Sequence, residues 1–458
     1  MDLRQYRHIH CIGIGGIGLS AIAEILLSRG YRVTGSDIKE SDVTKHLQSL
    51  GAGVYLTHDA ENLGDTDLLI YSAAVAADNP ELAAAKQRGI AILSRAEALG
   101  VIMADYDLPI AVSGTHGKTT TTSMISLILE HAELSPTILI GGIVSEFAGN
   151  VKVGTSEYFV TEACEYMDSF LYLRPMVEVI LNIDSDHLDY FRDIDHIAQS
   201  FRAFAKRVPP QGCVVAYDAN PFVKAAVSDL PCRVVRFGFS DSSDYCAKNI
   251  QFDGTGCPSY DLYGSGKFLG GMHLSVPGEH NVANSLAAIA TCRELGVPLD
   301  IIRDTLQAFT GTQRRFDMQG TTDKGVVVVD DYAHHPTEIR ATLDAAKNVP
   351  HKKLWCLFQP HTYTRTRALF DEFADALSLA DVVVLAEIYA AREKNVYRLS
   401  SSSLAERILE QHPDKTVLFF PDFDSIADYV IRHAEEGDLV FTMGAGDIYR
   451  VGDLILCR

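Results

Sequence analysis

The sequence is short of positive charge, of paired cysteines and of long apolar runs. Its 458 residues include 40 Lys and Arg against 60 Asp and Glu, and the net charge of −20 argues against a nucleic-acid partner, whose phosphates would need a basic surface. The nine cysteines form no Cys-x-x-Cys pair, so neither a disulfide framework nor a zinc site is indicated. No apolar run approaches the ~18 residues of a membrane helix, and polar residues follow the first four where a signal peptide would have its apolar core. We therefore expect a cytoplasmic protein without a nucleic-acid or membrane partner.

A glycine-rich junction at residues 112–122 organises the chain. An apolar run at 108–112 predicts a buried strand, and helical apolar spacing follows the junction. Backbone N–H groups and a helix N-terminus at such a turn bind phosphate. Lys118 is expected to follow the terminal phosphates, and the Thr119 hydroxyl is suited to Mg²⁺. Only two residues separate the glycines, where the usual phosphate loop has four. The nucleotide-binding residues predicted here are Gly114, Thr115, His116, Gly117, Lys118, Thr119 and Thr120.

Residues 1–106 form the first of about three α/β domains, the number expected at roughly 150 residues per domain. A strand at 8–12 leads into a second glycine turn at 13–18, and Asp37 follows at the interval of an acid that meets a ribose hydroxyl. Taken alone, this spacing favours a nicotinamide dehydrogenase. The residues themselves indicate only a diphosphate at the turn with a sugar or base at Asp37. The predicted ligand contacts are Gly15, Gly16, Ile17, Gly18, Ser36, Asp37 and Ser72.

In residues 107–312, polar side chains follow predicted strands beside the phosphate loop. Glu162 ends a strand at 158–162, and His187 follows a strand at 177–184. Carboxylate and imidazole groups there are well placed to ligate Mg²⁺ ions bridging nucleotide oxygens. Asn281 and Asn284 share one helix face, where their amides could read a base or cap the helix. Residues 235–275 predict an antiparallel edge without an assigned function.

Residues 313–458 predict a second Rossmann-type unit. A β-branched run at 325–331, typical of a strand buried on both faces, delivers Asp331, Tyr332, His334 and His335 to its end. A strand at 354–358 ends in a second basic cluster, residues 359–367. Two basic clusters at adjacent strand ends indicate an anionic substrate.

Seven motifs in this order resemble those of the Mur ligases, the ATP-dependent amino-acid ligases of peptidoglycan precursor synthesis. They lie at residues 13–18, 114–119, 182–187, 280–281, 314–317, 331–338 and 359–361. The shortened phosphate loop is normal for this family. The resemblance implies three α/β domains: a Rossmann-like N-terminal domain, a central P-loop-type ATPase domain with a mainly parallel sheet, and a Rossmann-like C-terminal domain.

The resemblance also implies what each domain binds. Residues 1–106 would hold the UDP part of a sugar substrate rather than NAD, residues 107–312 would bind ATP, and residues 313–458 would close over the site and contribute to amino-acid binding. The motifs are closest to those of members that add L-alanine to UDP-N-acetylmuramate. In that reaction ATP phosphorylates the lactyl carboxylate, and the alanine amine attacks the acyl phosphate. The implied cofactors are ATP and two Mg²⁺ ions, with Mn²⁺ as the alternative, in a monomer or a homodimer.

The resemblance implies functional roles for the residues of this sequence that occupy the family's motif positions. The catalytic set is Lys118, His187, His334 and Arg365, and the metal ligands are Thr119, Glu162 and His187. Asn281, Asn284, Arg314 and Asp331 join the phosphate loop at ATP. Tyr332, His335, His361, Arg365 and Arg367 are expected to bind the amino acid, because an arginine fork fits its carboxylate.

Two departures from the family pattern affect these roles. Many relatives have an arginine after the histidine of the Gln-Pro-His motif, where this chain has Thr362, so Arg365 or Arg367 must bind the carboxylate. Several sister ligases use a carbamylated lysine, and Lys206, the one lysine loosely placed for it, is expected instead to be solvated.

Three alternatives stay open. A sister ligase that recycles a murein tripeptide onto the same nucleotide sugar would need a larger acceptor pocket. A nicotinamide dehydrogenase explains the first glycine turn but leaves the Gly-Lys-Thr loop unexplained. A non-catalytic nucleotide-sugar sensor would have no need of Lys118, Glu162 and His187.

Overall fold

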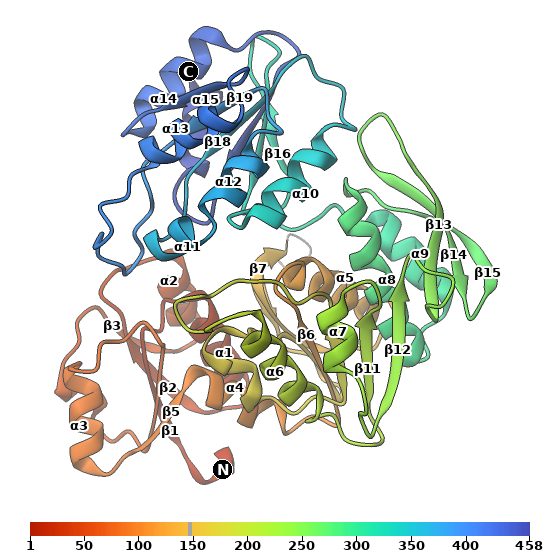
Figure 1. Cartoon of the computed structure of the whole chain (residues 1–458). Helices are drawn as coiled ribbons and strands as arrows, with labels where there is room; N and C mark the ends of the chain where they lie inside the picture. The colour runs from red at the N-terminus through yellow and green to blue at the C-terminus, as the bar shows by residue number, and fades with distance from the viewer. Residues whose placement is uncertain (145–148) are drawn as a thin grey trace.

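The computed structural model describes residues 1–144 and 149–458 and contains three β-sheets that follow one another along the chain (Figure 1). With their helices they form three α/β units, which we call the N-terminal, central and C-terminal units. Most strand pairs in the three sheets are parallel, so the predicted fold class is confirmed. Among the described residues, no helix is both long and apolar enough to cross a bilayer.

The N-terminal unit is a five-stranded parallel sheet in the order β3-β2-β1-β4-β5. The strand order reverses between β1 and β4, and the first glycine turn leaves the carboxyl end of β1 at this point, where such folds bind ligands. Its strands are β1 (His8–Ile12), β2 (Arg32–Ser36), β3 (Gly53–Tyr55), β4 (Leu68–Tyr71) and β5 (Ala91–Ser94). Its helices are η1 (Leu3–Gln5), α1 (Ile17–Ser28), α2 (Asp42–Ser49), η2 (Ala60–Leu63), α3 (Pro80–Arg88) and α4 (Arg95–Met103).

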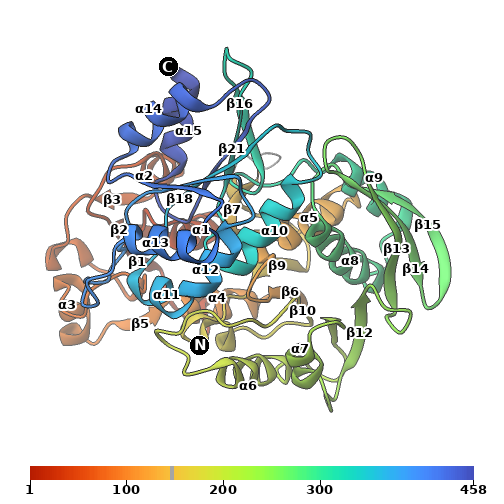
Figure 2. The same cartoon turned by 45° about the horizontal axis from the view of Figure 1, so that its top comes forward.

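The central unit has a ten-stranded sheet in the order β15-β14-β13-β12-β11-β10-β6-β9-β7-β8. Its strands are β6 (Leu108–Ser113), β7 (Thr137–Val144), β8 (Gly149–Lys152), β9 (Tyr158–Glu162), β10 (Val177–Ile180), β11 (Cys213–Tyr217), β12 (Arg233–Gly238), β13 (Tyr245–Phe252), β14 (Pro258–Gly264) and β15 (Lys267–His273). Its helices are α5 (Lys118–His131), η4 (Tyr166–Tyr172), α6 (Ile194–Ala205), α7 (Pro221–Ala226), α8 (Glu279–Glu294) and α9 (Leu299–Ala308). The predicted antiparallel edge is present as β13–β15, which Figures 1 and 2 show on the side away from the N-terminal unit.

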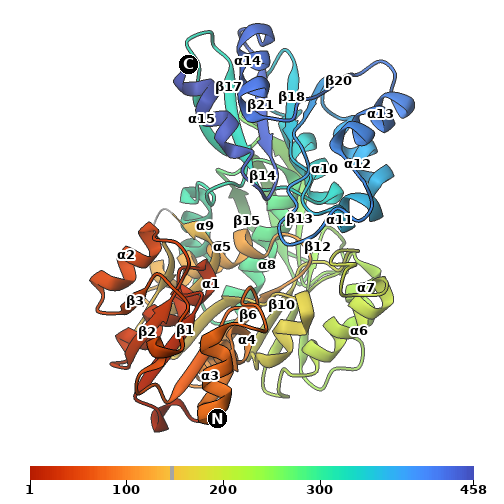
Figure 3. The ribbon, with the colours of Figure 1, turned by 90° about the vertical axis from the view of Figure 1, so that its left-hand side faces the viewer.

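The C-terminal unit is a six-stranded sheet in the order β16-β17-β21-β18-β19-β20, antiparallel only between β16 and β17. Its strands are β16 (Asp317–Thr321), β17 (Val327–Asp331), β18 (Leu354–Phe358), β19 (Val382–Leu385), β20 (Thr416–Phe419) and β21 (Leu439–Met443). Its helices are α10 (Pro336–Ala346), α11 (Tyr363–Ala368), α12 (Phe370–Leu377), α13 (Ser401–Gln411), α14 (Phe423–His433) and α15 (Tyr449–Cys457). Figures 1 and 3 show α10 and α11 on the side of this unit that faces the other two.

The three units do not share their cores equally. One continuous buried cluster runs from β1 and α1 of the N-terminal unit to η4 and α6 of the central unit. The C-terminal unit has separate clusters on the two faces of its own sheet. The N-terminal and central units are therefore joined by apolar packing, and the C-terminal unit is not part of that core.

One strand is shorter than predicted, and the difference builds the site. The apolar run at 177–184 predicts a strand throughout, but β10 ends at Ile180. Beyond it, the two oxygens of Asn182 accept hydrogen bonds from the N–H groups of Thr115 (3.2 Å) and His116 (2.8 Å) in the phosphate loop. These bonds replace the sheet ladder and turn the chain across the loop.

Candidate active site

The loop between β6 and α5 has the geometry of a phosphate site. Gly114 and Gly117 have φ angles of 139° and 85°, which side chains rarely adopt. A Cβ at Gly117 would lie 2.6 Å from Oδ1 of Asn284 on α8. Both glycines are therefore required by the backbone, and the N-terminus of α5 opens directly after them.

Lys118 is turned onto its own loop and onto a carboxylate that the sequence reasoning missed. Its Nζ lies 2.9 Å from Oε2 of Glu165, donates to the carbonyl of Thr115 at 3.1 Å, and contacts the carbonyl of Gly114. Burial alone would lower the pKa of Lys118, but the charge and hydrogen bond of Glu165, together with the charge of Glu162 and the nearby Cys164, raise it. The one sequence signal for Glu165, whose side chain is 2% exposed, is a second carboxylate three residues after the strand end.

The predicted metal ligands flank this lysine. Glu162 accepts a hydrogen bond from the N–H of Gly141 at 2.7 Å. Thr119 lies against Gly142, the residue after Gly141, because a Cβ at Gly142 would be 2.9 Å from Cγ2 of Thr119. Both residues thus lie against the Gly141–Gly142 pair of β7, and their oxygen atoms are of the kind that Mg²⁺ prefers.

His187 lies on the other side of Glu165. Its φ of 53° is unusual for a non-glycine residue, and backbone strain of this kind is concentrated at functional sites. Its Nε2 lies 3.9 Å from Oε1 of Glu165, and its ring centroid lies 4.6 Å from that of Tyr166. The structure thus gathers Lys118, Glu165 and His187 around one point.

His116 joins the central unit to the C-terminal unit. Its ring lies between Asp184 (Nε2 to Oδ2, 3.2 Å) and Glu338 of α10 (Nδ1 to Oε1, 3.3 Å). Burial alone would lower the pKa of His116, but the hydrogen bonds and charges of these two carboxylates raise it to about 9. The imidazolium is therefore charged at neutral pH and holds one carboxylate from each unit.

A second histidine reinforces this junction. His335 accepts a hydrogen bond at Nδ1 from the N–H of Thr337 (3.2 Å) and donates from Nε2 to the carbonyl of Ser185 (2.9 Å). His116, Asp184 and His335 have ligand atoms within 4.8 Å of one another, a spacing that could hold a cation. Their lone pairs and protons are already committed, so we assign the cluster to joining the units rather than to a metal.

The larger cavity, about 820 Å³, lies between the phosphate loop, α8 and α10. Aromatic side chains line one side of it, Phe239 and Phe252 among them. Asn281 and Asn284, both nearly buried, line it too, and the Asn284 amide donates to Oδ1 of Asn281 at 3.0 Å. The predicted nucleotide contacts in its lining are His116, Gly117, Thr120, Asn281, Asn284 and Asp331.

Asp331 and Arg315 lie at the larger cavity, whereas Arg314 does not. Asp331 accepts from the N–H of Phe316 at 2.9 Å, and burial raises its pKa to about 6. Arg315 lines the large cavity. Arg314 instead binds Asp330 at 2.9 Å and the Gly444 carbonyl at 2.7 Å inside the C-terminal unit. The structure therefore brings Arg315 to the cavity, whereas the prediction named Arg314.

The smaller cavity, about 480 Å³, lies on the other side of the same segment and is lined by Asp186, His187, His361 and Arg365. Arg365 donates to Asp186 from Nε (2.9 Å) and Nη2 (3.3 Å), and from Nη1 to Nδ1 of His361 (3.2 Å). Burial, with the charge of Arg365, lowers the pKa of His361 to about 4, so the ring is neutral at pH 7.

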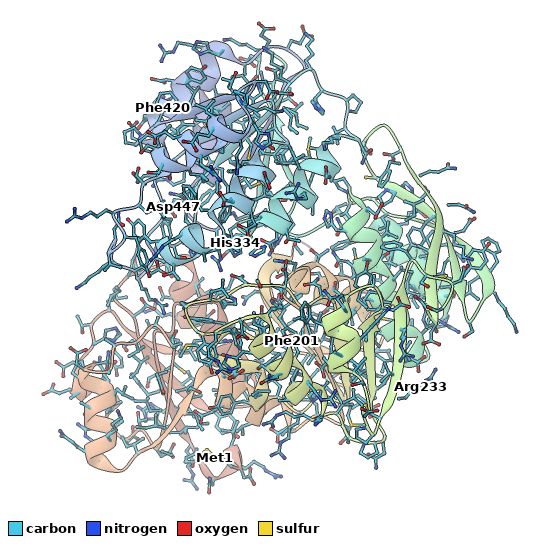
Figure 4. The ribbon with its side chains drawn as sticks, in the orientation of Figure 1. Met1, Phe201, Arg233, His334, Phe420 and Asp447 are labelled. Carbon is cyan, nitrogen blue, oxygen red and sulfur yellow. The ribbon has the colours of Figure 1, made fainter. Side chains whose placement is uncertain are left out.

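The other predicted amino-acid contacts surround this cavity or lie outside it. His334, labelled in Figure 4 at the edge of the C-terminal unit, donates from Nδ1 to the Tyr332 carbonyl at 3.0 Å, and burial lowers its pKa to about 3. The Tyr332 ring lies between Arg314 and Arg315. Arg367 stacks on Tyr397 with its Cζ 4.5 Å from the ring centroid, away from the cavity lining.

The first glycine turn is the third part of the site. Gly15 donates its N–H to Oδ2 of Asp37 at 2.9 Å, so the acid braces the turn. Gly16 caps α1, and a Cβ at Gly18 would lie 3.2 Å from Nη1 of Arg95, a cation that the sequence reasoning missed. Ser72 packs against Gly13.

The prediction for Ser36 is corrected. Its side chain is completely buried and donates to Oε2 of Glu81 at 2.6 Å. Glu81 is also fully buried and needs donors to satisfy its oxygens. The hydroxyl is thus buried in the core and hydrogen-bonded to Glu81.

Comparison with known proteins agrees with this geometry. Three family models match in order: "Mur ligase family, catalytic domain" at residues 8–107, "Mur ligase middle domain" at 112–292 and "Mur ligase, glutamate ligase domain" at 314–446. The chain belongs to the Mur ligase family.

Individual Mur ligases match over the whole chain. A UDP-N-acetylmuramate–L-alanine ligase of Alkaliphilus metalliredigens is 51% identical over 458 residues, covering 100% of this chain and 99% of the relative. The same-named protein of Caldanaerobacter subterraneus is 50% identical over 456 residues, covering 100% and 98%. The crystal structure of a UDP-N-acetylmuramate–alanine ligase from Thermotoga maritima matches with a TM-score of 0.83 at 30% identity, and a murein peptide ligase from Psychrobacter arcticus with 0.74 at 26%, each covering 98% of both chains.

Proposed function

We propose that this chain is an ATP-dependent ligase that joins L-alanine to the lactyl carboxylate of UDP-N-acetylmuramate, forming ADP and phosphate. The observation that carries the proposal is that one segment, hydrogen-bonded to the phosphate loop, separates two cavities, the larger of which reaches that loop. Residues 182–184 line the larger cavity and residues 186–189 the smaller one. A phosphoryl donor on one side and an acceptor on the other would meet at Lys118 and His187. Full-length relatives at 46–51% identity that carry this enzyme name support the choice of substrates.

ATP would occupy the larger cavity. Its base would lie near Asn281, Asn284 and the aromatic wall, and its phosphates would lie on the glycine loop. Lys118 would exchange Glu165 for phosphate oxygens, because an ammonium group neutralises the charge that in-line transfer spreads over those oxygens. Arg315 and Asp331 would contact the nucleotide from the C-terminal unit.

The residues around Lys118 fit a divalent cation. Thr119, Glu162 and His187 would hold Mg²⁺, as one ion or two, or Mn²⁺ in its place, and Glu165 is near enough to contribute. When bound, such an ion neutralises the oxygens of the reacting carboxylate and phosphate. The protein's own part is to keep these donors beside the lysine.

The acceptor would enter the smaller cavity. The acyl phosphate of the lactyl group would form beside His187, and the amine of alanine would attack its carbonyl carbon, releasing phosphate. His334 donates from Nδ1 to the Tyr332 carbonyl, which leaves Nε2 as a hydrogen-bond acceptor that would orient the attacking amine.

The remaining assignments follow the three units. Residues 1–106 would hold the UDP-sugar at the turn formed by Gly15, Gly16, Ile17 and Gly18, with Asp37, Ser72 and Arg95 around it. Residues 107–312 would bind ATP, and residues 313–458 would close over both cavities. The chain would act as a monomer or a homodimer.

The deciding measurement is phosphate release from ATP with UDP-N-acetylmuramate and, in turn, L-alanine, glycine, L-serine or the murein tripeptide. Release that requires both the sugar and L-alanine is expected. Tight sugar binding without release from any amine would contradict the proposal and indicate a sensor.

A murein tripeptide ligase is the second candidate, favoured by the likeness to the murein peptide ligase structure. Turnover with the tripeptide but not with L-alanine would select it. A nicotinamide dehydrogenase accounts for neither cavity at the phosphate loop and is not proposed.

A further inference from the structure

The arginine that the sequence assigned to the smaller cavity, Arg365, lines it but is already paired there. An amino-acid carboxylate needs a positively charged donor with free N–H groups. Arg365 is already bonded through three nitrogens to Asp186 and His361, and its side chain is 11% exposed. Arg367 stacks on Tyr397 instead. Neither predicted arginine is therefore free to hold the carboxylate.

Arg392 lines the same cavity and is exposed. Within the part of the chain that the structure describes, residues 1–144 and 149–458, no ion pair or hydrogen bond engages its guanidinium. It lies close enough to Tyr166, across the cavity, for its charge to oppose the burial that raises the pKa of that tyrosine to about 12.

The loop that carries Arg392 is tied to the site. Tyr389 donates its N–H to the Pro360 carbonyl (2.8 Å), and Thr362 donates to the Tyr389 carbonyl (2.9 Å). The next residue, Glu393, accepts from the N–H of Thr364 at 2.9 Å. Arg392 is thus held beside the Gln-Pro-His segment.

The charges around the cavity suit a zwitterion. Asp186 is neutralised by Arg365, and His361 is uncharged at pH 7. What remains in the lining is the positive Arg392 and the carboxylates of Glu393 and Asp189, the latter bonded to the Tyr166 hydroxyl at 2.7 Å. A small α-amino acid can place its carboxylate at Arg392 and its ammonium group at the carboxylates.

We propose that Arg392 binds the α-carboxylate of the incoming amino acid and thereby selects acceptors that carry this group. The inference rests on the proposed function, since it names a contact of the same acceptor site. Arg365 then acts as a positioning residue, which holds His361 and the segment around Asp186.

The test is steady-state phosphate release by the full chain at saturating ATP and UDP-N-acetylmuramate, with L-alanine varied. For Arg392→Ala we expect the KM for L-alanine to rise roughly 10- to 100-fold, the loss of one charge-assisted hydrogen bond. The KM for ATP should stay as in the wild type. Arg392→Lys keeps the charge but loses the paired N–H donors of the guanidinium. Its KM for L-alanine should therefore lie between those of the wild type and Arg392→Ala.

The matched control is Arg398→Ala, an exposed arginine of the same loop outside the cavity lining, which should leave all three KM values unchanged. L-alaninamide provides a second readout, because it lacks the carboxylate. The wild type should prefer L-alanine strongly, and Arg392→Ala should lose most of that preference.

Two failures can be told apart. A wild-type enzyme that does not turn over L-alanine would contradict the proposed function. If the wild-type enzyme turns over L-alanine, the inference alone would be overturned by one result. In that result, Arg392→Ala has an unchanged KM for L-alanine and an unchanged preference for L-alanine over L-alaninamide. An Arg392→Ala variant whose KM values rise equally for ATP and L-alanine would overturn it as well.

Discussion

The two interfaces that the central unit makes are of opposite chemical character. Toward the N-terminal unit the contact is apolar and tight: Gly100 of α4 packs on the Tyr172 carbonyl, and Tyr106 lies 5.0 Å from Phe159 between ring centroids. Toward the C-terminal unit it is polar. Arg365 binds Asp186, and Thr337 donates to Asp184 at 2.7 Å.

The difference bears on motion. Apolar area returned to water costs about 25 cal/mol per Å², whereas hydrogen bonds to charged groups can be exchanged for water at a smaller net cost. We therefore expect the N-terminal and central units to move as one body and the C-terminal unit to open and close over the cavities. This hypothesis predicts compaction in small-angle scattering when UDP-sugar and an ATP analogue bind, and an unchanged radius of gyration would contradict it.

The largest effect is expected from breaking the polar interface. Asp186→Asn removes the charge facing Arg365 at almost constant shape, and removing one partner of a buried pair costs up to about 3–5 kcal/mol. The radius of gyration should rise, and a separate, lower unfolding transition of the C-terminal unit should appear in calorimetry. A single transition at the wild-type temperature would show that the pair does not hold the units together.

Breaking the apolar interface should act on stability rather than on opening. In Gly100→Ala the new Cβ would lie 2.4 Å from the Tyr172 carbonyl oxygen, an overpacking that costs about 1–3 kcal/mol. The melting temperature should fall without a new transition. Gly254→Ala is the control, since nothing lies within 4 Å of that position. Equal melting temperatures for the two variants would show that Gly100 is not tightly packed against the Tyr172 carbonyl.

A pH titration sharpens the comparison, because the polar interface contains His116, whose pKa differs from its ordinary value. The pKa of His116 is raised to about 9 in the folded protein, so its contribution is fully present below about pH 6.5 and is lost as the pH rises through 9. Protection factors in α10, which correct hydrogen exchange for its intrinsic rise with pH, should therefore fall between these values. In His116→Gln they should not change with pH, and wild-type protection factors that do not change either would remove the assigned role.

The smallest effect concerns a group in neither interface. Glu178 on β10 is fully buried, and burial raises its pKa well above the ordinary value. The stability that its neutral form provides at low pH is lost as the pH rises through that raised pKa. Glu178→Gln should thus melt a few degrees higher at pH 8 and match the wild type at pH 4. A lower melting temperature at pH 8 would show that the carboxylate is stabilised there.

Local patterns account for the parts of this molecule that are predictable from sequence. The alternation of apolar strand runs and helical spacing indicated the three α/β units, and β1, β9 and β18 have the predicted bounds. The phosphate loop was equally accessible, because its glycines, Lys118 and Thr119 are neighbours in the chain. Periodicity failed at β10, where hydrogen bonds to a distant loop end the strand.

The rest depends on contacts between residues far apart in the chain. Asp186 and Arg365 are separated by 179 positions, so nothing local reveals that this arginine is already occupied. Ser36 was misplaced for the same reason, since its partner Glu81 lies 45 residues away. Arg95 and Arg392 lie outside every motif and become visible only once the glycine turn and the smaller cavity are in place.

The segment 182–189 carries one further consequence. Its two ends line different cavities, and its middle reaches the C-terminal unit through Ser185. A substitution in it would change one contact at a time, but an inserted or deleted residue would shift both cavities and the contact between them in a single step. Over evolution this stretch is therefore expected to keep its length.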